Sequence, residues 1–544
     1  MEYGGELDPA TVPNSTTDVA TFGPSNVTNV INSDVIVNLD SLIFNSSASQ
    51  YTITAMDNIA LYGTGVVNDS AVMQSFVAGL FIFGNSASAG DRVNFTTVSG
   101  GFFFENTSSA GSATFNLSST FSQATILFYD DSTAGNATIN ASTSSEISFL
   151  DNSTGGNATL NLSTAAFAVF AESNHAEHMN GNCVGGAGQF SSQIDFEGSS
   201  DAGDGTFTAV GGSTSGEIGA FILLDGIATA DNATFIINGG MGAGLTGTEL
   251  FVMDSATAAN ANITANGGLG GSDGGAVVFT KKSKGGAASI TLNGNAVLDL
   301  SMHNAPGVTI GSLAGAGSVL LGANNLTIGS NNQSTRFAGT IEDGGSSGGS
   351  GGSLSKAGSG TLALSRANSY TGGTTVSAGI LRVANKNGSA TGTGPVNVNG
   401  GTLGGEGIIA GATTIGTGSG GGASLSPALG TNKQPTLIIQ SALIINSDAT
   451  YTYTFKARRN EARMDEVVAN GVTINGATLN LSGQAQGRLR RGLTLTLISN
   501  TSANPISGTF NNLPDGAIVS VNGNNFQASY RGGDGNDLTL TVVP

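Results

Sequence analysis

The sequence predicts an all-β protein, a single-stranded, right-handed parallel β-helix with an N-terminal arm and a C-terminal cap. Glycine makes up 84 of the 544 residues and only 10% of residues are charged, a composition that disfavours extensive helix. Similar segments recur at intervals of about 21 to 29 residues, within the range of solenoid repeats. Within each segment small and large apolar residues alternate with other residues at period two, which indicates strands with one buried face.

An aromatic position recurs through the first half of the chain. Phe83, Phe104, Phe128, Phe149 and Phe170 are separated by 21, 24, 21 and 21 residues. One segment cannot bury its own apolar face, so we expect successive segments to stack in parallel and these rings to form one buried column. Every backbone N–H and C=O then finds a partner in the coil above or below.

Three further columns align with the phenylalanines. Their members are Ser112, Asn136, Asn157, Asn232 and Asn260; Ala113, Ala137, Ala158, Ala233 and Ala261; and Phe115, Ile139, Leu160, Phe235 and Ile263. The Asn column is expected to stack as an amide ladder at a corner, as like residues do in cross-β assemblies. Residues 20–430 would form about 16 to 20 coils, and at about 4.8 Å per coil they would make a rod about 80 to 100 Å long.

The chain is expected to divide into five segments. Residues 1–19 form a Pro-containing N-terminal arm that covers the first coil, whose open edge would otherwise invite pairing. Residues 20–343 are irregular β-helix rungs, and the Gly/Ser-rich residues 344–353 are a flexible linker or a long turn between coils. Residues 354–430 are more regular rungs. Residues 431–544 form a C-terminal region that caps the solenoid and holds half of the chain's lysines and arginines.

The composition limits the class of partner and the compartment. A formal net charge of −19 disfavours nucleic acid and anionic membrane surfaces as partners. The sequence contains no run of 18 apolar residues, so no membrane-spanning helix is predicted. A single cysteine, Cys183, excludes an internal disulfide framework. The N-terminus "MEYGGELDPATVPN" has neither the basic nor the apolar region of a signal peptide. If the protein is exported, we expect this chain to be a processed form, without signal peptide or anchor.

The stretch "LSKAGSGTLALSRANSYTGGTTVSAGILRV" (354–383) resembles the passenger-associated repeat of bacterial autotransporters. The resemblance continues through residues 394–440 and 507–544, and residues 17–53 are similar to the opening of large proteins with autotransporter-associated β-strand repeats. It implies an exported passenger at the bacterial outer cell surface that folds as a β-helix outside the cell. It also implies that the C-terminal segment nucleates folding. The membrane barrel of the family is not present within these residues.

The most distinctive polar side chains are His175, His178 and Cys183, beside Glu172 and Glu177. Two histidines and a cysteine are zinc or copper ligands in many proteins, but the spacing H-x2-H-x4-C fits no standard zinc pattern. An aberrant coil with solvent-facing polar residues is the favoured interpretation, so we predict no metal and no cofactor.

The sequence "GGDGNDLTL" (532–540) resembles a calcium-binding nonapeptide. There is one copy, and Thr539 stands where the motif has a large apolar residue. A terminal β-turn is therefore predicted.

An enzyme acting on polysaccharide would need paired carboxylates, and "QIDFEGSSDAGDG" offers Asp195, Glu197, Asp201 and Asp204. Asp195 and Glu197 alternate with apolar residues, a pattern that would place both on one exposed face of a strand. The other aspartates lie in Gly-rich loops and are typical of turns. The sequence assigns no catalytic, cofactor-binding or metal-ligating residue.

Two other features are assigned to the corners of the coils. Lys281, Lys282 and Lys284 fall on a turn column that elsewhere holds Asp254 and Asp130, so a solvated corner or an ion pair with an acidic neighbour is expected. Asn-x-Ser/Thr triplets, which are also glycosylation signals, are interpreted as repeat corners. Examples are Asn136, Asn157, Asn232 and Asn262.

The favoured hypothesis is a non-enzymatic, rod-shaped extracellular passenger with an adhesive or structural role. Recognisable side-chain columns build the rod, and none converges on a polar cluster. The expected partners are other copies of the chain, associated head to tail or laterally into fibres, and surface glycans. The alternatives are a polysaccharide lyase or hydrolase with its site at residues 172–205, and a passenger that binds glycans there without cleaving them.

Overall fold

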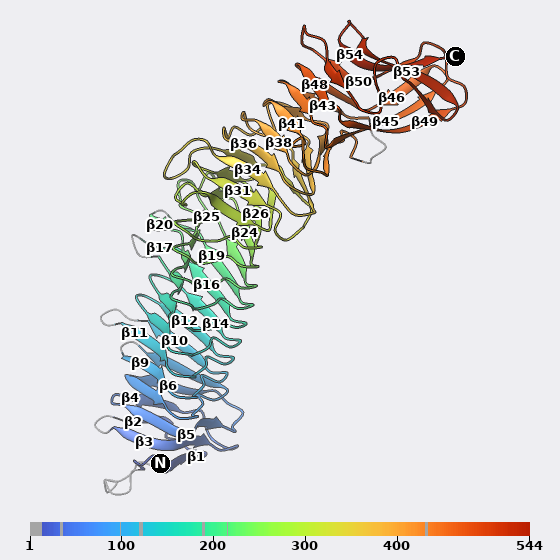
Figure 1. Cartoon of the computed structure of the whole chain (residues 1–544). Coiled ribbons are helices and arrows are strands. Elements are labelled where there is room, and N and C mark those ends of the chain that lie inside the picture. Colours follow the sequence, from blue (N-terminus) through green and yellow to red (C-terminus); the bar gives the residue numbers. More distant parts are fainter. Residues whose placement is uncertain are drawn as a thin grey trace. The chain divides into compact units, whose positions relative to one another are not determined.

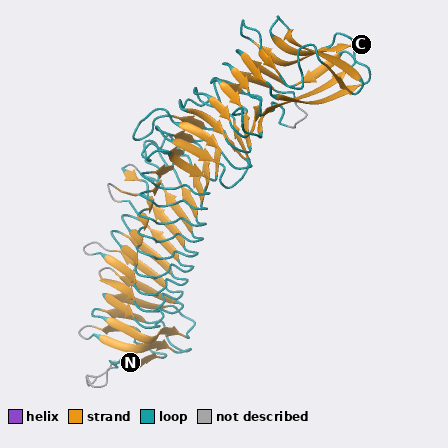
Figure 2. Ribbon diagram, in the orientation of Figure 1, coloured by secondary structure: helices purple, strands orange, loops and turns teal. Residues whose placement is uncertain are grey.

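The computed structural model describes residues 13–32, 36–97, 100–118, 123–187, 191–214, 216–429 and 434–544. Within them every regular element is a strand, and Figure 2 shows these strands joined by loops. No helix in the described part of the chain is long and apolar enough to span a membrane. Nearly all strand pairs are parallel, which confirms the predicted parallel β-helix (Figure 1).

Two compact units make up the chain. Unit 1 consists of Met1–Lys284 and Gly294–Ala296, and unit 2 of Gly285–Asn293 and Val297–Pro544. Each unit is a stack of coils with its own buried interior.

Each coil of unit 1 supplies one strand to each of two parallel sheets. The strands of sheet A, in order, are β1 (Val19–Phe22), β3 (Val37–Phe44), β5 (Ile59–Asn68), β7 (Leu80–Phe83), β9 (Gly100–Phe104), β11 (Ala124–Phe128), β13 (Glu146–Phe149), β15 (Phe167–Phe170), β18 (Gln193–Phe196), β21 (Phe221–Leu224), β23 (Glu249–Val252) and β25 (Ala276–Phe279). Those of sheet B are β2 (Asn29–Asn32), β4 (Thr52–Ala55), β6 (Gln74–Ala78), β8 (Val93–Thr97), β10 (Thr114–Ser118), β12 (Thr138–Ser142), β14 (Thr159–Leu162), β16 (Asn180–Val184), β19 (Thr206–Val210), β22 (Thr234–Ile237) and β24 (Asn262–Ala265). A short antiparallel pair, β17 (Gly186–Ala187) and β20 (Glu217–Ile218), projects from two neighbouring coils.

The predicted phenylalanine column is the centre of unit 1. Phe128 pairs with Phe149, and Phe149 with Phe170, in the register of sheet A. Their rings stack with centroids 4.7 and 4.4 Å apart and planes within 5° of parallel. Phe83 and Phe104 extend the column on one side, and Phe196, which the sequence alignment omits, extends it on the other. All six side chains are fully buried.

The turn from sheet A to sheet B repeats from coil to coil. Its middle residues form a column of single parallel bridges, which runs through Ser88, Ser109, Thr133, Thr154, His175, Asp201, Thr229, Thr257 and Lys284. Gly135 follows Thr133 with a φ of +58°, and a Cβ there would lie 2.9 Å from the Gly111 carbonyl oxygen of the coil below. Glycine is favoured at this position both by the left-handed conformation and by the close approach of the backbone.

Unit 2 uses wider coils that add a third and a fourth sheet. The strands aligned in one three-stranded ladder are β27 (Val297–Asp299), β30 (Ser318–Leu320) and β33 (Thr340–Glu342). A second parallel ladder contains β26 (Ser289–Leu292), β29 (Ser312–Gly315), β32 (Thr335–Phe337), β35 (Thr361–Leu364), β37 (Ile380–Val383), β39 (Gly401–Gly405), β42 (Ala423–Leu425), β45 (Ala449–Arg458) and β49 (Thr478–Gln486), with β46 (Glu461–Met464) antiparallel to β45.

The third ladder contains β28 (Gly307–Ile310), β31 (Asn325–Ile328), β34 (Ser353–Lys356), β36 (Gly373–Val376), β38 (Val396–Val398), β41 (Thr413–Ile415), β44 (Leu443–Ile445), β48 (Val472–Asn475) and β51 (Ser507–Thr509). The fourth contains β40 (Ile408–Ile409), β43 (Thr436–Ile439), β47 (Glu466–Ala469), β50 (Thr494–Asn500), β54 (Asp537–Val543), β53 (Asn524–Gly532) and β52 (Ile518–Val521). In this last sheet β50, β54, β53 and β52 pair antiparallel, so the regular parallel stacking ends there.

The Gly/Ser-rich residues 344–353 form a loop between β33 and β34. Asp299 accepts hydrogen bonds from the backbone N–H (2.9 Å) and the hydroxyl (2.7 Å) of Ser346, and Asp343 accepts one from the N–H of Gly352 (2.9 Å). These carboxylates hold both ends of the loop against the coils. Of the predicted N-terminal arm, residues 1–12 lie outside the described residues, and Asn14 accepts a hydrogen bond from the N–H of Asn38 in β3 (2.9 Å).

Replacing Phe149 by alanine is expected to destabilise unit 1 by about 3 to 5 kcal/mol, because the change removes a fully buried ring between two stacked neighbours. Phe167→Ala, in the next strand of the same sheet, is the matched control, since Phe167 lies on the outer face and is partly exposed. Urea denaturation followed by circular dichroism measures both. Equal loss of stability in the two variants would contradict the column as the main source of core stability.

Candidate functional site

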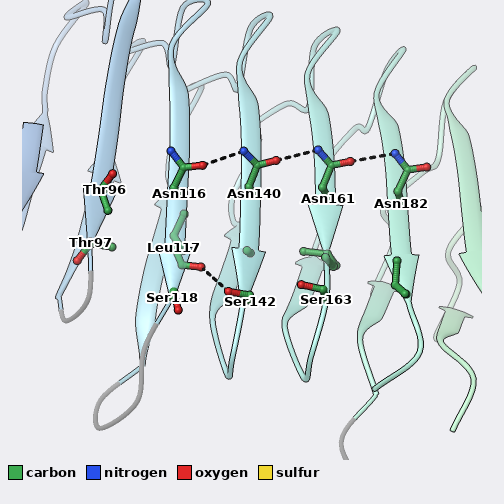
Figure 3. Close-up of a pocket in the computed structure, with 13 residues that line it drawn as sticks. Thr96, Thr97, Asn116, Leu117, Ser118, Asn140, Ser142, Asn161, Ser163 and Asn182 are labelled. Atoms are coloured by element: carbon green, nitrogen blue, oxygen red, sulfur yellow. Dashed lines mark hydrogen bonds between the residues drawn. The ribbon is translucent and has the colours of Figure 1, made fainter. Parts of the chain in front are cut away.

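A groove runs across the ends of successive strands on the outer side of sheet B. Its volume is about 450 Å³. The residues that line it come from β8, β10, β12, β14 and β16 and the residue that follows β14: Thr96, Thr97, Asn116, Leu117, Ser118, Asn140, Ala141, Ser142, Asn161, Leu162, Ser163, Asn182 and Val184. The same positions of neighbouring coils therefore form the walls of one continuous depression (Figure 3).

A ladder of asparagine side chains crosses this groove. The Nδ2 of Asn116 donates to Asn94 Oδ1 (2.7 Å), that of Asn140 to Asn116 Oδ1 (2.9 Å) and that of Asn161 to Asn140 Oδ1 (2.9 Å). Asn182 donates to Asn161 Oδ1 at 3.1 Å and completes the row drawn in Figure 3. Each side chain is half-buried. Because all the amides point the same way, their dipoles reinforce one another along the row.

The rest of the groove is rich in hydroxyl groups. The Ser142 hydroxyl donates to the Leu117 carbonyl oxygen at 3.3 Å, whereas those of Ser118 and Ser163 make no hydrogen bond to another described residue. The side chains of Leu117 and Leu162 point the other way and are buried in the core, in the register column that contains Cys183. None of the lining residues is ionisable.

The predicted amide ladder at the corner also exists. Asn157 donates to Asn136 Oδ1 and Asn260 donates to Asn232 Oδ1, both at 3.2 Å. These side chains are exposed, as predicted for repeat corners. The ladder inside the groove was not predicted. Its sequence signal is the recurring F-N-L-S, I-N-A-S and L-N-L-S of β10, β12 and β14, in which Asn occupies the outward position of each strand.

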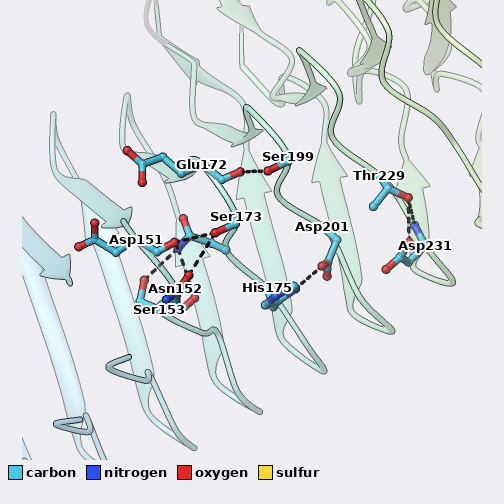
Figure 4. Close-up of polar contacts among 11 residues, drawn as sticks. Asp151, Asn152, Ser153, Glu172, Ser173, His175, Ser199, Asp201, Thr229 and Asp231 are labelled. Atoms are coloured by element: carbon cyan, nitrogen blue, oxygen red, sulfur yellow. Dashed lines mark hydrogen bonds and ion pairs between the residues drawn. The ribbon is translucent and has the colours of Figure 1, made fainter. Parts of the chain in front are cut away.

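The histidines and the cysteine of the aberrant coil are not brought together. His175 pairs through Nδ1 with Asp201 of the next coil (Figure 4). His178 Nδ1 lies 3.8 Å from Asp204 Oδ2. Both imidazoles are more than half exposed. In the described part of the chain no group of three or more His, Cys, Asp or Glu side chains is arranged to hold a metal ion.

Cys183 points into the core, whereas the two histidines face solvent. It pairs in register with Leu162 and Ala209, and its side chain is fully buried. Its Sγ lies 3.7 Å from the carbonyl oxygen of Thr208. Burial raises the pKa of the thiol, and the nearby Asp195 carboxylate raises it further. The thiol therefore stays protonated and takes no part in ligation or nucleophilic chemistry.

Asp195 is the one carboxyl of the 195–204 stretch that lies in a strand. It stands on the outer side of β18 between Val169 and Leu223 and is 8% exposed. Gln193 Nε2 donates to its Oδ2 at 2.5 Å, whereas Oδ1 has no hydrogen-bond partner among the described residues. Desolvation is the main cause that raises its pKa to about 6. Glu197 follows in the next turn and is exposed, and Asp201 and Asp204 face the two histidines.

Two further corner features agree with the sequence-based interpretation. Lys281 forms an ion pair with Asp254 of the preceding coil, and Lys282 and Lys284 are exposed. The calcium-like stretch 532–540 forms the turn of the β53–β54 hairpin, in which Gly533 has a φ of +57°. The predicted terminal turn is confirmed.

The chain resembles proteins that bacteria export. The passenger-associated transport repeat matches residues 354–383, which form β34, β35, β36 and β37 of unit 2. Over 105 residues the chain is 39% identical to the adhesin BmaC autotransporter of Brucella suis biovar 1 (strain 1330). That match covers 19% of this chain and 3% of the relative's length. The predicted resemblance to autotransporter passengers with passenger-associated repeats is confirmed.

Asp195→Asn is expected to stabilise the protein at neutral pH by about 1 to 3 kcal/mol, because it removes a poorly solvated charge. The pKa of Asp195 is about 6 in the folded state, above the value of about 3.9 in an unfolded chain. The folded protein therefore holds this proton more tightly, and the stability that the carboxyl contributes below about pH 4 is lost as the pH rises through 6.

The measurement is the midpoint of urea denaturation at pH 4 and pH 7.5. The midpoint of the Asp195→Asn variant should be higher than that of the parent at pH 7.5 and close to it at pH 4. Asp69→Asn, the same change at an exposed position between β5 and β6, is the control and should change neither midpoint. A stabilisation by Asp195→Asn that is equal at both pH values would exclude titration of this carboxyl as the cause.

Proposed function

We propose that this protein is a surface-exposed passenger of a bacterial cell, with an adhesive and structural role and no catalytic activity. The observation that carries the proposal is the passenger-associated transport repeat at residues 354–383, which forms coils of a parallel solenoid. Similarity to an autotransporter adhesin supports it.

The physical properties of the chain suit an extracellular role. The fold is held by ring stacking, by backbone pairing between coils and by side-chain ladders, and the single cysteine is free and buried. Its stability is therefore independent of the redox potential of the surroundings. Serine, threonine and asparagine, in place of charged residues, make up much of the solvent-facing surface, which offers many hydrogen-bonding groups to a partner.

A role without catalysis is supported by the geometry of the strongest candidate carboxylates. Asp195 is covered by its neighbours and hydrogen bonds to Gln193, whereas Glu197 lies in the following turn and is exposed. Glycosidic cleavage needs two carboxyl groups that face the same bond. The alternative, a polysaccharide lyase or hydrolase at residues 172–205, would have to assemble such a pair from one carboxyl that is covered in a strand and others that are exposed in turns.

Self-association is the finer part of the proposal. Within the described residues β1 pairs on one side only, with β3, and an unpaired strand edge is a ready template for another chain. In unit 2 the antiparallel strands β54, β53 and β52 interrupt parallel stacking. We therefore expect copies to associate through the N-terminal edge or through the lateral faces.

Surface display tests the adhesive role. A non-adherent bacterium that carries this chain on an unrelated membrane anchor should attach to glycan-coated or matrix-coated surfaces and settle faster than cells that display an inert β-protein. Display of Asp195→Asn/Glu197→Gln should give the same attachment. Attachment at the level of the inert control would contradict the adhesive role, and release of sugars from a polysaccharide panel that this double variant abolishes would establish the enzyme instead.

Analytical ultracentrifugation of the purified chain tests self-association. The sedimentation coefficient should rise with concentration, and a variant with Thr21→Pro in β1 should weaken the rise if the N-terminal edge is used, because proline removes a backbone donor. A single species at all concentrations would contradict association.

A further inference from the structure

The geometry points to a binding track for an uncharged polysaccharide in the groove that contains Asn116, Asn140, Asn161 and Asn182, with the sugar chain lying along the ladder. This inference rests on the proposed adhesive function and names the ligand class and the site. The groove lies on sheet B, apart from the carboxylates of residues 195–204.

The ladder leaves each amide with unused hydrogen-bonding capacity. A carboxamide has two N–H donors and two acceptor lone pairs. In Asn140 one donor is used on Asn116 and one lone pair on Asn161. A second donor and a second acceptor therefore remain on each of the inner members of the row. Sugar hydroxyls both donate and accept hydrogen bonds, so they can bond to the remaining donor and the remaining acceptor of each amide.

The Ser118 and Ser163 hydroxyls add two groups without partners among the described residues. Because the ladder fixes the amides before any ligand arrives, binding does not have to order them.

The spacing of the ladder favours a polymer. Equivalent groups recur once per coil, about 4.8 Å apart, because adjacent strands of a sheet have that separation. A pyranose in an extended chain advances by a comparable distance, so successive sugars can meet successive coils in the same way.

Charge complementarity selects an uncharged ligand. None of the residues that line the groove is ionisable, whereas the chain carries a net charge of −19. An anionic polysaccharide would be repelled by the whole protein and would find no cation in the groove. A cationic one would find no carboxylate there.

A peptide is disfavoured by the backbone of the same strands. β12 pairs with β10 on one side and with β14 on the other, and β14 pairs with β12 and β16. The strands under the groove therefore have no open edge to which an extended peptide could add by main-chain hydrogen bonds.

Affinity electrophoresis of the purified full chain tests the inference, with neutral polysaccharides (a β-glucan, a galactomannan, a dextran) and anionic ones (alginate, polygalacturonate) in the gel. At least one neutral polymer should retard the protein, and the anionic polymers should not. Asn140→Leu/Asn161→Leu should lower the affinity at least about tenfold, since each lost hydrogen bond contributes about 0.5 to 1.5 kcal/mol. Ser142→Ile, which narrows the groove and leaves the amide ladder in place, should lower it as well.

The matched control is Asn136→Leu/Asn157→Leu, which removes the exposed corner ladder outside the groove and should leave affinity unchanged. Equal weakening by both double variants, or retardation by anionic polymers or by peptides alone, would overturn the inference. If cells that display the chain adhere but the purified chain binds no neutral polysaccharide, the groove assignment fails and the adhesive function stands. If neither occurs, both fail.

Discussion

Parallel pairing in register is the constraint on which the rest of this structure depends. It places each side chain directly over the equivalent side chain of the next coil, so a residue that suits one level must suit its neighbours above and below. Phe149 between Phe128 and Phe170 shows the favourable case, since three flat rings stack with nearly parallel planes. A shift of one residue along a strand would turn every inward side chain outward, and the buried column holds the register against such a shift.

The same constraint explains how the irregular coil around residues 172–205 is tolerated. In this coil Met179 stands in the column of otherwise small side chains that contains Ala158. Gly181 stands in the neighbouring column of large side chains, which contains Leu160. A Cβ at Gly181 would lie 2.6 Å from the ring of Phe207, so the phenylalanine of the next coil occupies the space that the glycine leaves. A small side chain in one coil is thus compensated by a large side chain in the next, so the interior stays filled. Apart from Asp195 in β18, the histidines and acidic residues of this coil lie in its turns, where length and composition affect packing least.

Outward positions are free of the packing constraint, yet the repeat still orders them. Once the backbone is in register, Asn116, Asn140 and Asn161 lie at hydrogen-bonding distance and form a continuous row. A solenoid thus converts a weakly repeated sequence into a regular surface. Such a surface presents many equivalent groups, as adhesion requires, whereas catalysis requires a few groups that converge on one point. Asp195 shows what happens when an outward position holds an ionisable residue. The neighbouring side chains cover its carboxyl, and this burial raises its pKa to about 6.

The sequence by itself determined the inward columns, the turns and the fold class, because period-two alternation and repeat length depend on residues close together in the chain. It predicted the phenylalanine column and the exposed corner ladder, and the repeat at residues 354–383 carried the resemblance to autotransporter passengers. It also predicted that the polar side chains of the aberrant coil, among them His175 and His178, face solvent. Only the tertiary structure decided that Cys183 points inward and that Asp195 is buried. It alone joined the asparagines of five strands into the ladder of a groove, because those contacts form between coils more than 20 residues apart, where a difference of one residue in a turn changes which side chains meet.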